Sequence, residues 1–477
     1  MSVPARRPAA RVRPLSLLGA ASMLLAALAS DSAAAQAPTA TPAWAAALDS
    51  AVTAEMARTR TPGAQVAVVV DGRLAYTRGY GVADIETGRA VTDRTLFRVG
   101  SVTKMISAAT VNQLVAAGKL DLQAPISTYV TELAGKRVGT VTTQQLLTHS
   151  AGWLDNAVAY GRMGEGALGE VMREVSDTLF FTTPGTVISY SNPGYSMAGY
   201  VAERAGGQRF AALTDLHVLR KLGMPHATFR PLEALTRDFS QGHVGGPNLP
   251  GVVVRPFTEN TAQWAAGFLF ASAGDLSRFT IAMMDGGMLD GQRVLDAGTV
   301  TRMTTGHMPM PGRANARYGH GLMIDVRDGT RIWQHGGAIN GFDAQVTMFP
   351  DRKVAVIVLD NRGGAPMQGL VDLVARRTMG ITPPVEPKLP EDRVGTPAER
   401  ALVAGTYAMG STKVQIVEEN GALVFIQGDK AAVKLVGEDR IAVIDPDGTR
   451  TLLWLVRGAR GRVDFLHMSL RSLARQP

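Results

Sequence analysis

Cysteine is absent from the 477 residues of the sequence. The chain therefore folds without disulfides, performs no thiol chemistry and offers no cysteine for a lipid anchor. Without such cross-links the fold has to be held together by an apolar core. The chain is long enough for two or more domains of ordinary size, each with a core of its own.

Signatures of several protein classes are absent as well. The sequence has neither a His-Glu-x-x-His pair nor a Gly-x-Ser-x-Gly elbow, so the zinc-protease and α/β-hydrolase classes lack their motifs. The net charge is +8, yet there is no dense basic run and no basic stripe with interleaved aromatics, which argues against a nucleic-acid partner. His307 lies near two methionines in a Gly- and Pro-rich loop, where gap filling explains methionine better than a copper site does. We expect no metal and no cofactor.

The first 35 residues have the pattern of an export signal. A region with four arginines precedes an apolar stretch that is too short for a comfortable membrane span, and small residues follow, with cleavage simplest after Ala35. No later stretch of about 18 apolar residues is present. We expect an exported protein, periplasmic or secreted, whose mature chain has no membrane span.

The rest of the chain changes its pattern twice. Strand patterns around a favoured two-residue turn at Asp71-Gly72 come first, and a mostly helical stretch runs from Thr95 to about Asp290. Strand-rich segments then return up to residue 380. This order predicts an α/β (α+β) domain over 36–380, in which a sheet built from both ends of the region is flanked by helices.

A second domain is predicted beyond that region. The segment 381–395 is proline-rich and marks a linker. Short strands follow it, in hairpins around an Asn-Gly turn at 420–421 and an Asp-Gly turn at 447–448. We expect 396–477 to form a small all-β, barrel-like domain.

Ser101 and Lys104 stand three positions apart, where an apolar helical pattern begins. Residues at i and i+3 of a helix share one face, about 5–6 Å apart between Cβ atoms. A serine in the first turn also has free backbone N–H groups nearby, which can stabilise an oxyanion. The lysine can act as a base only where burial or a second cation lowers its pKa. Ser-x-x-Lys also occurs by chance as an ordinary helix start with a solvated lysine, so the pair has to be weighed with other motifs.

Tyr190 and Asn192 stand two positions apart in "YSNPGY". A cationic lysine can lower the pKa of a nearby phenol, which can then exchange protons with a leaving group. An asparagine has donors and an acceptor, so it can hold the lysine and a substrate amide together. An Asx-type turn before a helix is the plain alternative.

The segment "WQHGGAING", 333–341, joins a strand pattern to glycines. A strand edge without side chains lets a substrate backbone lie against it, and a free N–H there can form half of an oxyanion hole. The alternative is a strand that ends in a flexible turn, with its histidine bonded to a neighbour.

In this order the three motifs resemble those of the serine β-lactamase and penicillin-binding-protein superfamily. They are most similar to the branch of class C β-lactamases, DD-peptidases and esterases, which carries Ser-x-x-Lys, Tyr-x-Asn and a [KH]-[TSG]-Gly strand motif. "LLTHSAGW", 146–153, resembles a segment common in that branch. The resemblance covers about 44–380 and implies an antiparallel sheet flanked by helices with a helical subdomain. The segment 396–477 is similar to lipocalin-like domains appended to some members.

The resemblance also implies roles for the candidate residues. Ser101 would be the acylated nucleophile, Lys104 its base or electrostatic partner, and Tyr190 a proton shuttle. Asn192 would bind Lys104 and the substrate. The division of the base role between Lys104 and Tyr190 stays open.

The strand motif would be occupied by His335, Gly336 and Gly337. By the same resemblance, the backbone N–H groups of Ser101 and Ala338 would form the oxyanion hole. Several members have a lysine where this chain has His335, and that permanent cation attracts a substrate carboxylate. A histidine, with a reference pKa of about 6.5, is only partly charged near neutral pH. We expect this departure to weaken activity on β-lactams and to leave room for esters, D-amino-acid amides or small peptides.

These observations predict an exported serine hydrolase that acts through an acyl-enzyme on amide or ester bonds. The substrate is a small molecule or peptide, namely a β-lactam, a D-amino-acid peptide related to peptidoglycan, or a carboxylic ester. The alternative is a non-catalytic or slowly acylating protein that binds penicillin or cell-wall peptide. The sequence contains no signal for the oligomeric state.

Overall fold

The computed structural model describes residues 42–477, apart from 157–159, 246–250, 314, 328, 365–367, 381–388 and 459–460. The predicted export signal, 1–35, lies outside the described residues, and so does 381–388 of the predicted linker. No helix among the residues that the structure describes is both long enough and apolar enough to cross a membrane.

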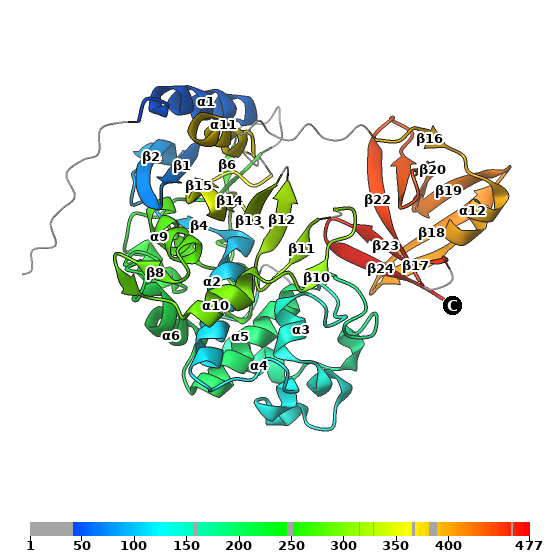
Figure 1. Ribbon diagram of the computed structural model, residues 1–477, viewed down its shortest axis with the longest axis horizontal. Coiled ribbons are helices and arrows are strands. Elements are labelled where there is room, and N and C mark those ends of the chain that lie inside the picture. The colour runs from blue at the N-terminus through cyan, green and yellow to red at the C-terminus, as the bar shows by residue number, and fades with distance from the viewer. Residues whose placement is uncertain are drawn as a thin grey trace, which may run out of the picture. The chain divides into compact units, whose positions relative to one another are not determined.

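A nine-stranded antiparallel sheet forms the centre of the larger domain (Figure 1). Strands from both ends of that region meet in it, because β1 pairs with β15, which confirms the predicted arrangement. In spatial order the strands are β10 (Met308–Pro309), β11 (Arg317–Tyr318), β12 (Met323–Arg327), β13 (Thr330–Ile339), β14 (Phe342–Phe349), β15 (Val354–Asp360), β1 (Gly63–Val70), β2 (Arg73–Asp84) and β3 (Arg89–Ala90).

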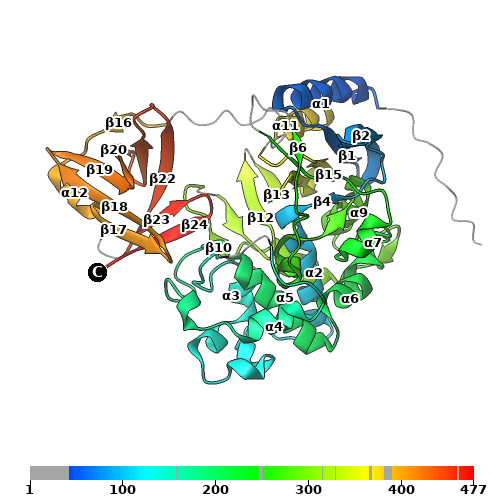
Figure 2. The ribbon, with the colours of Figure 1, turned by 180° about the vertical axis from the view of Figure 1, so that it is seen from behind.

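Helices cover both faces of this sheet. Helices α1 (Ala45–Thr59) and α11 (Gln368–Met379) lie together over one face, as Figures 1 and 2 show from opposite sides. Helices α2 (Thr103–Ala116) and α9 (Ala273–Met284) share the core on the other face. Side chains of β1 alternate between the two cores, so Val66 joins the first and Ala67 the second. This two-sided burial explains why the sequence of β1 is apolar apart from Gln65.

The expected helical region forms a subdomain around α2. Its remaining helices are α3 (Thr143–Leu147), α4 (Ala167–Arg173), α5 (Asn192–Gly206), α6 (Phe210–Thr214), α7 (Pro231–Leu235), α8 (Trp264–Gly267) and α10 (Ala297–Thr304). Three short antiparallel pairs accompany them, namely β4 (Phe97–Arg98) with β7 (Phe270–Ala271), β5 (His243–Val244) with β6 (Val252–Val253), and β8 (Met288–Leu289) with β9 (Gln292–Arg293). Residues 103–114 of α2 are all buried. This buried helix therefore holds Lys104, in its first turn, in a fixed position.

The C-terminal strands form a closed barrel. It contains β17 (Gly405–Met409), β18 (Thr412–Glu419), β19 (Ala422–Gln427), β20 (Asp429–Val436), β21 (Arg440–Ile444), β22 (Arg450–Arg457), β23 (Val463–Met468) and β24 (Arg471–Arg475). Antiparallel pairing of β20 with β21 completes the ring, β16 (Asp392–Arg393) adds to its edge, and α12 (Pro397–Val403) precedes β17. Asn420 and Gly421, both with positive φ, make the predicted turn between β18 and β19. Closure removes the open edges that a sheet of this size would expose.

We expect Ser272→Ala to destabilise the larger domain, because Ser272 caps α9. Its Oγ accepts from the N–H of Asp275 at 3.0 Å and the Asp275 carboxylate accepts in return, which makes a buried capping box. Losing such a cap costs about 1–2 kcal/mol of unfolding free energy. Ser50→Ala, on the exposed face of α1, is the control and should cost under about 0.5 kcal/mol. Equal effects of the two variants in urea denaturation would contradict the role given to the cap.

Candidate active site

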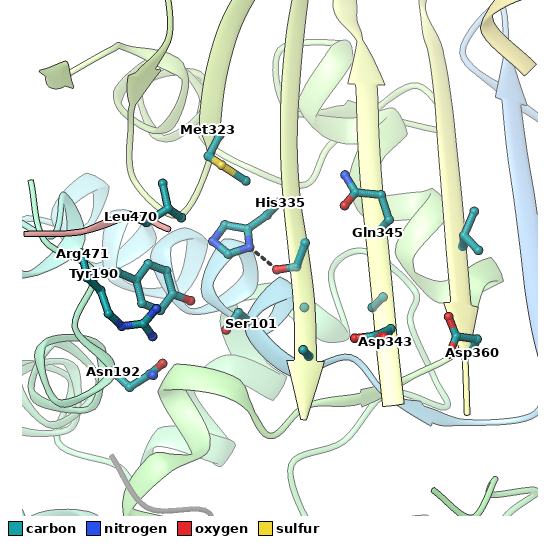
Figure 3. Close-up of a pocket in the computed structure, with 15 residues that line it drawn as sticks. Ser101, Tyr190, Asn192, Met323, His335, Asp343, Gln345, Asp360, Leu470 and Arg471 are labelled. Atoms are coloured by element: carbon teal, nitrogen blue, oxygen red, sulfur yellow. Dashed lines mark hydrogen bonds between the residues drawn. The ribbon is translucent and has the colours of Figure 1, made fainter. Parts of the chain in front are cut away.

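Three separate segments bring the predicted residues to one cavity of about 410 Å³ (Figure 3). The 3₁₀ turn η1 (Gly100–Val102) carries Ser101, the loop before α5 carries Tyr190, and α5 begins at Asn192. Strand β13 supplies the remaining predicted residues, which are His335, Gly336, Gly337 and Ala338. All of these line the cavity, and Lys104 is buried behind it.

The backbone of β13 crosses the turn around Ser101 at contact distance. A Cβ on Gly337 would lie 2.1 Å from Val99 O and 2.9 Å from Ser101 N. A Cβ on Gly100 would lie 2.6 Å from Ala338 N, and Gly100 also has a φ of +50° that favours glycine. Two glycines, one on each segment, therefore allow the two backbones to approach each other beside Ser101.

The Lys104 ammonium is fully buried and has an oxygen for each of its three donors. Its Nζ lies 3.2 Å from Ser101 Oγ and 2.7 Å from Asn192 Oδ1, and it also donates to the backbone oxygen of Ala266. Burial lowers the pKa of Lys104 to about 7, as the sequence argument required. As a neutral amine, Lys104 would keep two donors for Asn192 and Ala266 and turn its lone pair to Ser101.

The Tyr190 side chain lies over the lysine, with Lys104 Nζ 4.6 Å from the ring centroid. A hydrogen bond with Ser101 lowers the pKa of the Tyr190 phenol, but burial raises it by more, so the net direction is upward. The expectation that the cationic lysine depresses this pKa is therefore wrong. Desolvation of the phenolate outweighs the favourable contacts in this enclosed position.

Asn192 is held from both sides at the start of α5. Its Oδ1 accepts from Lys104, while its Nδ2 donates to the Asp155 carboxylate at 3.1 Å. Ser191 caps the helix by accepting from the Gly194 N–H, so the first turn that carries Asn192 is fixed locally. The Asn192 amide is thus oriented before any substrate arrives.

His335 is buried and neutral. Its Nδ1 donates to the backbone oxygen of Gly336, so its Nε2 accepts from the Tyr318 hydroxyl at 2.9 Å. Burial, reinforced by the charge of Lys104, lowers the pKa of His335 to about 3. The expectation of partial positive charge near neutral pH is therefore wrong, and this position supplies no cation to a substrate.

His149 supports the turn that carries Tyr190. Its Nδ1 accepts from the Ser191 N–H at 3.1 Å, and its ring lies 4.2 Å from that of Tyr190 between centroids. Burial lowers the pKa of His149 well below its ordinary value, so the imidazole that packs against Tyr190 is neutral.

Several residues that line or support the cavity were not predicted from the sequence. Leu470 and Arg471 come from the hairpin between β23 and β24 of the barrel, and Asp155 lies behind Asn192. Asp155 comes two residues after "LLTHSAGW", a local signal that could have been followed, whereas nothing in the sequence near 470 points to the site.

The cavity has two kinds of wall. On one side Met323 and Leu470 belong to an apolar cluster, whose other members are Ile188, Met308, Met310, Ala316 and Tyr318. On the other side the cavity extends over β14 and β15, where Gln345, Asp343 and Asp360 face it (Figure 3). Within the described part of the chain, no three His, Asp or Glu side chains gather as a metal site.

Known proteins resemble this chain in both sequence and fold. Over 365 residues the chain is 30% identical to penicillin-binding protein 4 of Amycolatopsis lactamdurans, a match that covers 72% of this chain and 93% of that protein. It is 36% identical over 202 residues to esterase EstB of Burkholderia gladioli, a match that covers 39% of this chain and spans 51% of the esterase.

Among solved structures, SurE superposes with a TM-score of 0.76 at 26% identity, covering 90% of this chain and 98% of SurE. SurE with D-Leu gives a TM-score of 0.74 at the same identity. The model of the beta-lactamase family matches residues 48–378. The chain therefore belongs to the beta-lactamase family of serine hydrolases.

Proposed function

We propose that the protein is an exported hydrolase in which Ser101 attacks an amide or ester bond and is acylated. The observation that carries this proposal is the contact of Ser101 Oγ with a buried lysine of pKa about 7, inside a cavity open to a substrate. A base is most effective when its pKa lies near the working pH. Lys104 meets that condition.

The reaction follows from the hydrogen bonds. As Ser101 Oγ bonds to the carbonyl carbon, its proton passes to the network of Lys104 and Tyr190 and the carbonyl oxygen takes the negative charge. The N–H groups of Ser101 and Ala338 would hold that oxyanion. Collapse expels the leaving group, which takes a proton from the network. Water then attacks the acyl carbon, gives up a proton to the same network, and Ser101 leaves with its proton restored.

For the substrate, we favour a D-amino-acid peptide or amide with an apolar side chain. The apolar wall of Met323 and Leu470 suits such a side chain, and the crystal structure of SurE with D-Leu shares the fold over 90% of this chain. The neutral His335 removes the fixed cation that β-lactams use elsewhere in the superfamily. A carboxylic ester is the second candidate, since the esterase EstB is 36% identical over part of the chain.

We also propose the location and the domain limits from the sequence. The N-terminal signal pattern, cleaved near Ala35, would direct the protein to the periplasm or the medium, where peptidoglycan-derived peptides occur. The hydrolase domain would span 36–380, the linker 381–395 and the barrel domain 396–477.

A labelling experiment tests the acyl-enzyme. We expect a fluorophosphonate to label the wild-type protein and Ser101→Ala to lose the label, because only an activated serine reacts. In parallel, p-nitrophenyl esters, nitrocefin, D-Ala-D-Ala peptides and D-amino-acid amides are assayed with both proteins. Labelling without turnover of any substrate would favour the non-catalytic binder, and labelling that survives in Ser101→Ala would refute the assignment of the nucleophile.

Lys104→Ala should cost more activity than His335→Ala. Lys104 would take part in every proton transfer, so we expect kcat to fall about a thousandfold. His335 is neutral and bonded to Tyr318, so its loss should change kcat less than about tenfold and act on substrate preference. Comparable losses of kcat on two unrelated substrates would contradict this division.

The two neighbouring glycines of β13 offer a matched pair. Gly337→Ala should reduce kcat/KM about a hundredfold or more, because its Cβ would press into the backbone of Val99 and Ser101. The loss of kcat/KM in Gly336→Ala should be much smaller, since its Cβ would meet the end of the Gln345 side chain at 3.1 Å and the backbone oxygen of Ala344 at an ordinary contact distance of 3.8 Å. A larger loss in Gly336→Ala would show that the contact with Ser101 does not set the geometry.

A further inference from the structure

The hairpin between β23 and β24 joins the barrel to the segment that carries Tyr190. The Tyr190 N–H donates to Leu470 O at 2.7 Å, and Ser472 Oγ donates to Ile188 O at 2.9 Å. Ser469 and Leu470 both have positive φ, so the tip of the hairpin is a tight turn. These backbone contacts give the hairpin a defined place at the cavity.

Arg471 on this hairpin forms a two-point contact with Asp155. Its Nε donates to Asp155 Oδ2 at 2.9 Å, and its second nitrogen donates to the same oxygen. The Asp155 side chain is only 6% exposed, so this ion pair is shielded from water on the carboxylate side. The guanidinium also lies 5.3 Å from the centroid of the Tyr190 ring.

Asp155 in turn fixes Asn192. Its Oδ1 accepts from the Asn192 backbone N–H at 3.0 Å and from Nδ2 at 3.1 Å. Because a carboxylate can only accept, it holds the NH₂ side of the amide and turns Oδ1 to Lys104. A continuous set of hydrogen bonds therefore runs from Arg471 through Asp155 and Asn192 to Lys104, which contacts Ser101.

The ion pair of Asp155 and Arg471 also changes the electrostatic environment of Lys104. The Asp155 carboxylate raises the pKa of Lys104 and the Arg471 guanidinium lowers it, both by less than burial does. The Asp155 carboxylate likewise raises the pKa of Tyr190, and the Arg471 guanidinium lowers it. The effect therefore does not depend on whether Lys104 or Tyr190 is the base. Within the described part of the chain, the titratable side chains that face Lys104 include Tyr190, Tyr195, His149 and His335, and Tyr318 lies beside the two tyrosines.

We propose that Asp155 and Arg471 are positioning residues of the active site, through which the barrel domain becomes part of the catalytic machinery. Asp155 orients Asn192 toward Lys104, and Arg471 neutralises the carboxylate so that its charge does not stabilise the protonated lysine. This inference rests on the proposed acyl-enzyme mechanism.

The test is the pH dependence of kcat/KM between about pH 5 and pH 10 in the full-length protein. Arg471→Met removes the cation and leaves the negative charge of Asp155 without a partner, so the pKa of the base rises. The acid limb of the profile, where kcat/KM falls as the base becomes protonated, then moves to higher pH. Asp155→Asn removes the anion and leaves the guanidinium, so the limb moves to lower pH, with kcat reduced about tenfold as Asn192 loses its orientation. Arg471→Lys keeps the charge and should hold the limb near the wild-type position.

A second Arg–Asp pair of the barrel region is the matched control. Arg450 donates to Asp392 at 2.7 Å, and neither residue lines the cavity. Arg450→Met and Asp392→Asn should leave the limb in place, which separates a charge effect at the site from a general loss of barrel stability.

Opposite shifts in the two site variants support the proposal, because a merely structural contact would move neither limb or move both alike. Limbs that stay in place, or that shift in the same direction, overturn it while Ser101 labelling still stands. If Ser101→Ala retains the label, both the acyl-enzyme mechanism and this inference fall.

Discussion

The burial of one ammonium group is the constraint on which the site depends. Moving a charged lysine out of water is costly unless every donor finds an acceptor. In this protein the three acceptors come from three distant segments, namely Ser101, Asn192 and Ala266, and Tyr190 and Tyr195 add their ring faces. The same enclosure that makes these partners necessary lowers the lysine pKa to about 7. Burial of the Lys104 ammonium therefore accounts both for the contacts that hold the site together and for the low pKa of its lysine.

The fold encloses the lysine by bringing the backbone of β13 close to the turn that carries Ser101. Gly337 of strand β13 and Gly100 of the turn allow the two backbones to meet beside Ser101, and the buried helix α2 fixes the lysine in place one turn later. The strand motif contributes its shape and its free backbone rather than a charge, since His335 is neutral. Arg471, a cation that lines the cavity and pairs with Asp155, comes from the barrel.

The sequence predicted those features that local chemistry determines. The Asn420-Gly421 turn depends on neighbouring residues only, and it is present. The family resemblance supplied the residues that line the cavity. The direction of the Tyr190 pKa shift was missed, because it depends on how completely the folded chain encloses the phenol. The contact of Asp155 with Arg471 was missed because its partners are 316 residues apart and no motif marks the second.

That separation has a consequence for how the protein is made. A chain emerges from the ribosome amino end first, so the helical subdomain and the central sheet are synthesised long before Arg471 exists. During that interval the Asp155 carboxylate has no guanidinium beside it and the loop of Tyr190 has no hairpin to bond. Long-range closure of this kind is slow compared with helix formation. The contacts of Arg471 with Asp155 and of Leu470 with Tyr190 can therefore form only after the last strands of the barrel have been synthesised.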